Sequence, residues 1–126
     1  PQFFHDAINN KFIKVFSNGK QTRTYCSIID AIPVIINISF FGKNFVYNIG
    51  NSNQEISAIS VAKIVKKTIG DMSVKVLKIP YPKNYPSNEP RRRCPDTNRI
   101  KKEFDFIPTV NLQNGLKLFY KFLNKE

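Results

Sequence analysis

The sequence predicts a mixed fold of interleaved helices and short strands, either α+β or an irregular α/β layer. Stretches with apolar residues at helical spacing alternate along the chain with short runs rich in β-branched and aromatic residues. The 126 residues, with 41% hydrophobic and 13% aromatic content, suffice for one domain with a core but are too few for two. No internal repeat or low-complexity segment interrupts the order. One mixed domain is therefore expected.

The N-terminal quarter of the chain predicts a helix followed by a β-hairpin. Apolar side chains recur at helical spacing from Phe3 to Ile8, and the helix is expected to stop at Asn9-Asn10. Residues 14–16 and 22–28 are β-prone, and residues 17–20 include the Asn and Gly types that tolerate a tight turn. This pattern predicts strand, turn and strand, with the two strands paired.

The most apolar part of the chain predicts a helix and a strand that are both buried. Asp30 can cap a helix that runs to about Phe40 and that Gly42 ends, with Pro33 tolerated in its first turn. Because this helix is apolar nearly all round, we expect it to be sandwiched between layers. Residues 44–49 are then expected to form a buried strand.

The second half of the chain predicts three helices, one strand and a long loop. The first of these helices has an apolar stripe and is expected to stop at Gly70. Residues 74–79 alternate in polarity, as a half-exposed strand does, and residues 80–95 form a loop that holds five of the eight prolines. The residues expected to open the three helices are Ser57, Asp96-Thr97 and Asn111.

Composition limits the classes of partner. The formal net charge of +11 suits nucleic acid, an anionic membrane or phosphorylated small molecules, without choosing among them. Cys26, Cys94 and the single His5 lack metal-ligand spacing, so free thiols in a reducing compartment are the simplest account. The longest apolar run, residues 31–41, is too short to span a bilayer. We therefore expect a cytoplasmic protein without a metal or a membrane partner.

Arg23 is the first candidate binding residue. Side chains alternate across a strand, so Arg23 and Tyr25 should share a polar face, and a guanidinium group suits phosphate or carboxylate oxygens. The alternative is structural, because Arg23 can instead pair with a local carboxylate such as Asp30 or Glu89.

Arg93 is the second candidate. It ends a run of three arginines, residues 91–93, and lies three positions before Asp96 at an expected helix start, where free amides and the helix dipole favour a phosphate. The alternative is a solvated basic loop, which is the preferred interpretation for Arg91 and Arg92. Two separate arginine elements together predict an anion site.

Five stretches carry a resemblance to a known family. In order, they are GKQTRTYCSIIDAI, VYNIGN, EISAISVAKIV, EPRRRCPDTNRIKKEF and VNLQNGLKLFYKFL. With this order and spacing the chain resembles the C-terminal part of the extended short-chain dehydrogenase/reductases. It is most similar to their nucleotide-sugar epimerases and dehydratases, and especially to the UDP-glucuronate decarboxylase branch. The first residue is Pro1 rather than methionine, so we expect a piece of a longer polypeptide.

The resemblance implies a fold and a set of substrate-binding residues. Residues 1–126 correspond to a nucleotide-sugar-binding C-terminal domain, the part of a Rossmann-type enzyme that follows its NAD-binding half. Arg23 and Arg93 correspond to diphosphate ligands, and Phe16 to an aromatic residue packed near the pyrimidine. Lys14 and Phe16 are expected to offer backbone groups to the base, and Tyr25 to line the same face. Asp96 is expected to cap a helix.

The resemblance also limits what this chain can do. No glycine-rich turn for NAD and no Tyr-x-x-x-Lys pair occurs, so no catalytic or cofactor-binding residue is assigned and the chain alone is expected to be inactive. The implied full-length enzyme is NAD-dependent, homodimeric and acts on a UDP-sugar by decarboxylation, epimerisation or dehydration. The alternatives are a non-catalytic basic module that binds nucleic acid and an inactive truncated product. The aromatics lie apart from the arginine run, which disfavours nucleic acid.

Overall fold

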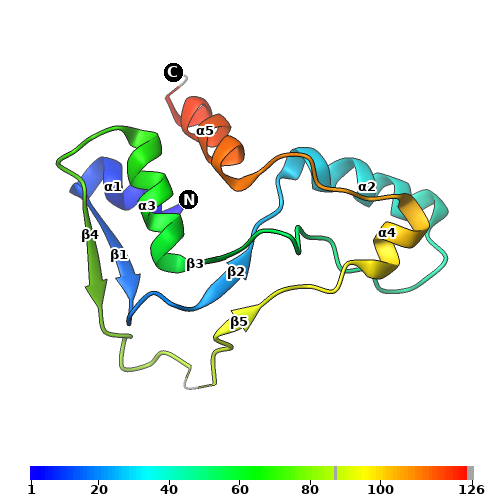
Figure 1. The fold of residues 1–126 in the computed structure, drawn as a ribbon, viewed down its shortest axis with the longest axis horizontal. Coiled ribbons are helices and arrows are strands. Elements are labelled where there is room, and N and C mark those ends of the chain that lie inside the picture. Colours follow the sequence, from blue (N-terminus) through cyan, green and yellow to red (C-terminus); the bar gives the residue numbers. More distant parts are fainter. Residues whose placement is uncertain (87, 125–126) are drawn as a thin grey trace.

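The computed structural model describes residues 1–86 and 88–124, which form five helices and five strands (Figure 1). The helices are α1 (Gln2–Asn10), α2 (Ile28–Phe41), α3 (Ala58–Ile69), α4 (Asn98–Phe104) and α5 (Leu112–Leu123). The strands are β1 (Phe12–Phe16), β2 (Thr22–Thr24), β3 (Glu55–Ser57), β4 (Lys75–Ile79) and β5 (Arg92–Arg93). Helices and short strands are interleaved, so the predicted mixed class is confirmed.

The main core lies where α1 and α3 pack on a two-stranded parallel sheet. β1 pairs with β4 from Phe12 opposite Lys75 to Phe16 opposite Ile79. Helix α5 stands against α3 and adds half-buried apolar side chains to this core (Figure 1). The buried core residues are Phe4, Ala7, Ile13, Val15, Val61, Ala62, Val65 and Val74.

The ends of α3 and α5 follow the sequence predictions. The Ser57 hydroxyl accepts a hydrogen bond from the Ser60 amide, and Gly70 takes the left-handed conformation at φ 76° that ends α3. The Asn111 side chain accepts from the Asn114 amide at the start of α5. These signals are local and are confirmed.

The predicted hairpin is wrong, because β1 and β2 belong to different sheets. β2 lies in the middle of a second sheet, antiparallel to β3 and parallel to β5. The turn after β1 is packed beneath α3, where the Gly19 carbonyl accepts from the Ile59 amide at 3.1 Å. A Cβ at Gly19 would lie 2.7 Å from Val15 Cγ1, so this turn packs closely on β1 and requires glycine.

The start of α2 also differs from the prediction. β2 ends at Thr24, and Ser27 caps α2 by accepting from the Ile29 amide at 3.2 Å. Asp30 therefore does not cap the helix, and the expected alternation of side chains does not extend to Tyr25. Asp30 instead reaches the segment before α5, where it accepts hydrogen bonds from Thr109 and from the Val110 amide.

The expectation that α2 is sandwiched between layers is wrong for the part of the chain that the structure describes. Val34 is its one buried residue, and Phe40 is 77% exposed. α2 lies with α4 in an extension away from the main core (Figure 1). Phe41 at its end is 70% exposed, and a row of exposed apolar side chains along the helix, called here the α2 outer face, consists of Ile28, Ile29, Ile32, Ile35, Ile36 and Phe40.

Residues 44–49 do not form the predicted buried strand. No backbone partner for them lies among the described residues, and Phe45 is fully exposed. Side chains of α4 hold this segment instead: Tyr47 donates to Glu103 at 2.6 Å, and Arg99 donates to the Val46 carbonyl at 2.6 Å. A β-prone segment without a neighbouring strand has no ladder to join.

Candidate functional site

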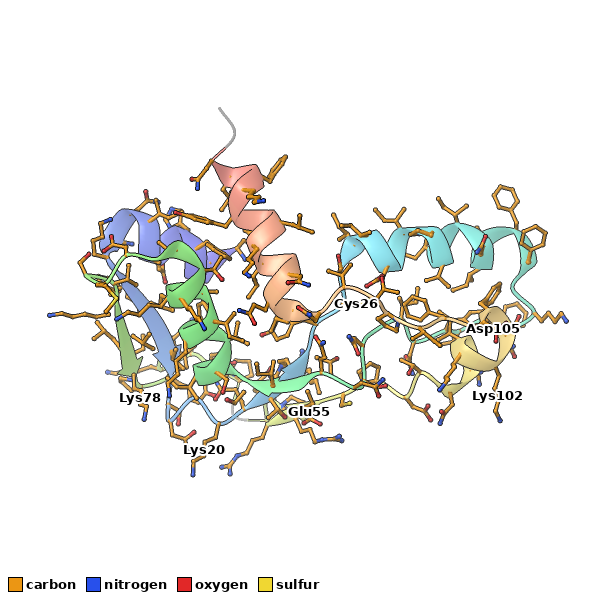
Figure 2. All side chains as sticks on the ribbon, turned by 45° about the horizontal axis from the view of Figure 1, so that its top comes forward. Lys20, Cys26, Glu55, Lys78, Lys102 and Asp105 are labelled. Atoms are coloured by element: carbon orange, nitrogen blue, oxygen red, sulfur yellow. The ribbon has the colours of Figure 1, made fainter. Side chains whose placement is uncertain are left out.

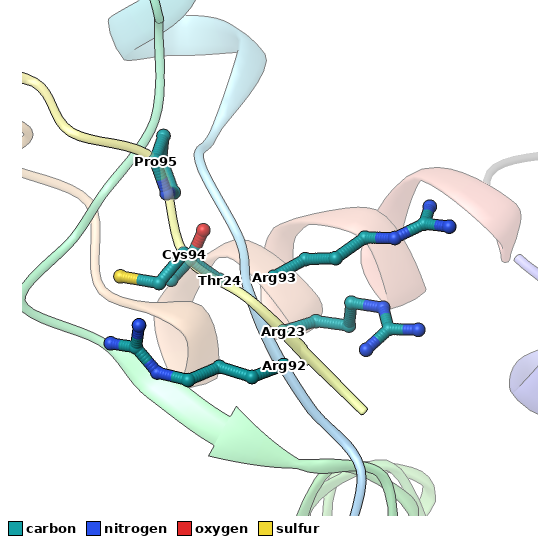
Figure 3. Close-up of a pocket in the computed structure, with 6 residues that line it drawn as sticks. All are labelled: Arg23, Thr24, Arg92, Arg93, Cys94 and Pro95. Carbon is teal, nitrogen blue, oxygen red and sulfur yellow. The ribbon is translucent and has the colours of Figure 1, made fainter. Parts of the chain in front are cut away.

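Strand register brings the two candidate arginines together. β2 and β5 run parallel, with Arg23 directly opposite Arg93 and Thr22 opposite Arg92. Because side chains alternate across strands, Arg23 and Arg93 lie on one face and Arg92 on the other. Figure 3 shows Arg23 and Arg93 pointing the same way and Arg92 pointing away from them. The surface formed by Arg23 and Arg93, called here the arginine face, borders an open hollow of about 660 Å³ that Thr24, Arg92, Cys94 and Pro95 also line.

Glu89 joins the two arginines. Its Oε1 atom accepts from Arg23 Nη2 at 2.7 Å, and its Oε2 atom accepts from Arg93 Nη2 at 2.9 Å. Arg23 is fixed further by its Nη1 atom, which donates to the Thr22 carbonyl at 2.7 Å. The structural pairing of Arg23 with Glu89 therefore exists, and it places both arginines around one anionic group.

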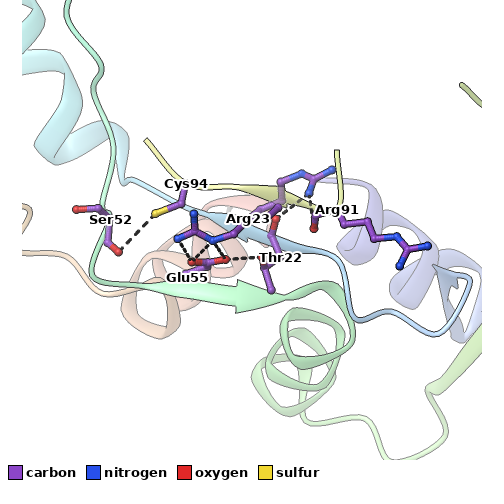
Figure 4. A network of polar contacts seen from close by, with 7 residues as sticks. Thr22, Arg23, Ser52, Glu55, Arg91 and Cys94 are labelled. Atoms are coloured by element: carbon purple, nitrogen blue, oxygen red, sulfur yellow. Dashed lines mark hydrogen bonds and ion pairs between the residues drawn. The ribbon is translucent and has the colours of Figure 1, made fainter. Parts of the chain in front are cut away.

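The opposite face of the same strands carries a separate ion pair. Glu55 on β3 binds the Arg92 guanidinium through both carboxylate oxygens, with the shortest contact at 2.8 Å, and accepts from the Thr22 hydroxyl (Figure 4). The bond from Thr22 and then those from Arg92 hold the pKa of Glu55 below its usual range. The same contacts raise the pKa of Arg92. Arg92 is thus already engaged by a carboxylate and is not a member of the arginine face.

Aromatic side chains gather at the end of β1. Phe16 stacks on Tyr81 with ring centroids 5.5 Å apart, and Tyr81 stacks on Tyr85 at 4.2 Å. Beside them is a second hollow of about 210 Å³, which Tyr81 and Arg91 line together with Gln21. The Thr22 amide donates to the Arg91 carbonyl at 2.8 Å, and Gln21 and Arg91 line the second hollow just before β2 and β5 begin.

The other predicted site residues, Phe16, Lys14 and Tyr25, are not among those that line the two hollows. Lys14 is exposed on β1, with its ammonium 5.3 Å from the centre of the Phe12 ring. Tyr25 follows β2, and burial raises the pKa of its hydroxyl while the nearby Arg23 lowers it.

Tyr81, Tyr85 and Glu89 are the site residues that the sequence analysis left without a binding role. All three lie in the proline-rich stretch between β4 and β5. The signal was the i, i+4 spacing of the two tyrosines in PYPKNY, followed by an acidic residue close before the arginine run. Asp96 lies one residue before Thr97, the N-cap residue of α4, and its Oδ1 atom accepts from the Asn98 amide at 2.8 Å.

The described residues do not fit a metal or an NAD site. Over residues 1–86 and 88–124, no three His, Cys, Asp or Glu side chains gather as metal ligands. β3 runs directly into α3, β2 leads into α2 through residues 25–27, and β5 leads into α4 through residues 94–97. None of these three connections contains the glycines that cradle a pyrophosphate. Of the helices described, none is long and apolar enough to cross a membrane.

Sequence comparison finds relatives that match most of this chain. No protein-family model matches it. The chain is 32% identical over 120 residues to UDP-N-acetyl-alpha-D-glucosaminuronate decarboxylase of Bacillus cytotoxicus. The aligned region covers 93% of this chain and 37% of that protein. It is 29% identical over 116 residues to UDP-glucuronic acid decarboxylase 3 of Arabidopsis thaliana, and this alignment covers 92% of this chain and 32% of that protein. The chain is homologous to the sugar-nucleotide decarboxylases. It spans about a third of the length of these curated relatives.

Solved structures agree with this homology. The fold matches dTDP-glucose 4,6-dehydratase of Bacillus anthracis, solved with NAD, with a TM-score of 0.83 and 21% identity over 100% of this chain and 39% of that one. It also matches UDP-glucose 4-epimerase of Thermotoga maritima, solved with UDP-glucose, with a TM-score of 0.79 and 25% identity over 97% of this chain and 38% of that one. The predicted resemblance of this chain to the extended short-chain dehydrogenase/reductases is confirmed.

Proposed function

We propose that residues 1–126 form the nucleotide-sugar-binding domain of an NAD-dependent enzyme and hold the diphosphate of a UDP-sugar on the arginine face. UDP-glucuronate is the substrate that the homology favours. The observation that carries the proposal is the β2–β5 register, which sets Arg23 beside Arg93 around one anionic group. Two guanidinium groups from different strands can hold a diphosphate from both sides.

The base would lie in the second hollow, beside the aromatic rings. Phe16, Tyr81 and Tyr85 form a stacked group at its edge, and aromatic faces are suited to stacking on a pyrimidine. Tyr81 is the ring of this group that lines the hollow, and Phe16 supports it by stacking on it. Lys14 would offer backbone groups to the base, and Tyr25 would line the same face.

The domain would work against an NAD-binding half. The α2 outer face presents a broad apolar surface, and residues 44–49 have a strand-like sequence without a pairing partner among the described residues. A helix with so little polar surface is normally covered. The solved relatives extend well beyond the matched region, so we propose that their NAD-binding half has a counterpart that covers this face. Hydride chemistry would belong to that half.

The test is binding of UDP by the natural polypeptide that carries this sequence, measured by isothermal titration calorimetry. Arg23→Gln and Arg93→Gln should each weaken binding about tenfold or more, because each removes a charge-assisted contact to the diphosphate. Arg92→Gln is the matched control. Arg92 borders the same hollow, but its guanidinium points away from Arg23 and Arg93 and is bound to Glu55, so affinity should stay within about twofold.

Two results would contradict the proposal. Absence of UDP binding by the folded wild-type polypeptide would remove the nucleotide-sugar assignment. Equal losses from Arg92→Gln and Arg93→Gln would show that net positive charge attracts the ligand and that the arginine face is not a specific site. Circular dichroism melting curves of all three variants show whether a loss of affinity reflects a loss of fold.

A further inference from the structure

Among the residues that the structure describes, Glu89 is the acidic side chain bound to both arginines of the arginine face. Each of its carboxylate oxygens accepts from a different guanidinium, at 2.7 Å from Arg23 and 2.9 Å from Arg93. The carboxylate therefore lies between the two side chains proposed to hold a diphosphate. A diphosphate that takes its contacts from the same donors must compete with this group.

We propose that Glu89 is an internal counter-anion of the arginine pair, and that the diphosphate of a nucleotide sugar displaces its carboxylate on binding. The inference rests on the proposed function. One carboxylate balances only one of the two guanidinium charges, whereas a nucleotide-sugar diphosphate brings one negative charge on each phosphate. Exchange of the carboxylate for the diphosphate would balance the charges of both arginines.

Arg23 does not depend on Glu89 for its position. Its Nη1 atom donates to the Thr22 carbonyl at 2.7 Å and approaches the Arg91 carbonyl at 3.4 Å, and its side chain is only 24% exposed. The backbone of β2 and the segment before β5 therefore hold this guanidinium. When the carboxylate leaves, Arg23 stays in place with its Nη2 atom available to the ligand.

The contacts that hold Glu89 are of the kind that a ligand can replace. Glu89 belongs to neither a helix nor a strand, and its amide makes a long hydrogen bond of 3.3 Å to the Pro86 carbonyl. Its partner Arg93 has a side chain that is 56% exposed, and ion pairs with that much water contribute little. A doubly charged ligand can therefore compete effectively for both guanidinium groups.

The displacement predicts that loss of the Glu89 charge strengthens binding. In the natural polypeptide that carries this sequence, Glu89→Gln should bind UDP about threefold to tenfold more tightly than the wild type by isothermal titration calorimetry. Asp105→Asn is the charge-matched control. It raises the net charge equally, stands outside both hollows and suits the left-handed backbone at φ 50°, so its affinity should stay within about twofold.

Two further variants make the test specific. Glu89→Asp keeps the charge but shortens the side chain, so the aspartate should bridge the two arginines less well. This variant should therefore bind UDP with an affinity between those of the wild type and Glu89→Gln. In an Arg93→Gln background the gain from Glu89→Gln should shrink, because one of the two competing contacts is already absent. Melting curves by circular dichroism establish that each variant is folded.

The outcomes separate this inference from the proposed function. Wild-type binding of UDP with an equal or weaker affinity in Glu89→Gln overturns the displacement and makes Glu89 a positioning residue, while the proposed function stands. A gain in Asp105→Asn equal to that in Glu89→Gln also overturns it, because net charge alone would explain both. Absence of UDP binding by folded wild type and folded Glu89→Gln overturns the inference and the proposed function together.

Discussion

At the scale of single residues, Gly19 holds the turn on which the separation of the two sheets depends. Its φ of 70° is in the left-handed region, and a Cβ there would lie 2.7 Å from Val15 Cγ1 and 2.8 Å from Ile59 Cβ. Both neighbours belong to packed elements, β1 and α3, which cannot easily move. Glycine at this position lets the chain leave β1 and enter β2 beneath α3.

Gly19→Ala is therefore expected to lower the free energy of unfolding by about 2–4 kcal/mol, through backbone strain and crowding together. The measurement is urea unfolding followed by circular dichroism. Gly70→Ala is the matched control, because Gly70 has φ 76° but an added Cβ would meet nothing within 4 Å. It should cost only about 1–2 kcal/mol, the strain term alone. Equal costs for the two variants would disprove the close packing around Gly19.

At the scale of elements, Asp30 ties the start of α2 to the segment that leads into α5. One carboxylate oxygen accepts from the Thr109 amide and hydroxyl, and the other accepts from the Val110 amide at 3.0 Å. Burial alone raises the pKa of Asp30, but these hydrogen bonds outweigh it and hold the pKa below its usual range. The ionised form is thus the one that joins the two elements.

This tie predicts an acid-sensitive contribution to stability. The pKa of Asp30 is lower in the folded chain than in the unfolded chain, where it is near 4, so the unfolded state binds more protons in acid. The contribution is complete above that value and is lost as the pH falls through the folded pKa. In Asp30→Asn the free energy of unfolding should be lower at pH 7 and should decline less between about pH 5 and pH 2.

Urea unfolding at a series of pH values measures this dependence. Asp105→Asn is the control, because no hydrogen bond to the Asp105 carboxylate occurs among the described residues, and its acid profile should follow that of the wild type. An unchanged profile in Asp30→Asn would refute the link between α2 and the segment before α5.

At the scale of the whole molecule, the core is concentrated at one end. The buried cluster belongs to α1, β1, α3 and Val74, the residue just before β4, while α2 and α4 contribute Val34 and Ile100 outside it. Figure 2 shows side chains of α2 directed away from the rest of the chain. This distribution supports the proposal that the α2 outer face is covered in the natural polypeptide.

The proposal predicts the cost of a charge on that face. Ile36 is 51% exposed here, so Ile36→Asp should change stability by less than about 0.5 kcal/mol if the face meets water. If an NAD-binding half covers it, the same substitution should cost at least about 2 kcal/mol, because an unpaired carboxylate would be buried. We expect the larger cost, measured as thermal and urea unfolding of the natural polypeptide.

Leu118→Asp provides the comparison for Ile36→Asp. Leu118 is 49% exposed in the middle of α5. Leu118→Asp therefore also places an aspartate inside a helix, with a similar loss of helix propensity, but it does not alter the α2 outer face. It should remain within about 1 kcal/mol of the wild type. Similar small costs for both variants would argue against a covered α2.

The accuracy of the sequence predictions follows the range of the interactions involved. Ser57, Gly70 and Asn111 mark helix ends through contacts within a few residues, and these were predicted correctly. The hairpin, the sandwiched α2 helix and the strand at 44–49 were wrong, because each depends on what lies beside the segment in space.

The amino-acid sequence alone indicates the helices, the mixed class, the homology and the two arginine elements. The pairing of β1 with β4, the pairing of β2 with β5 and the position of Glu89 between Arg23 and Arg93 follow from the three-dimensional fold. The physical reason is that a helix satisfies its hydrogen bonds within itself. A strand takes its partner from distant parts of the chain, and the partner fixes which side chains share a face.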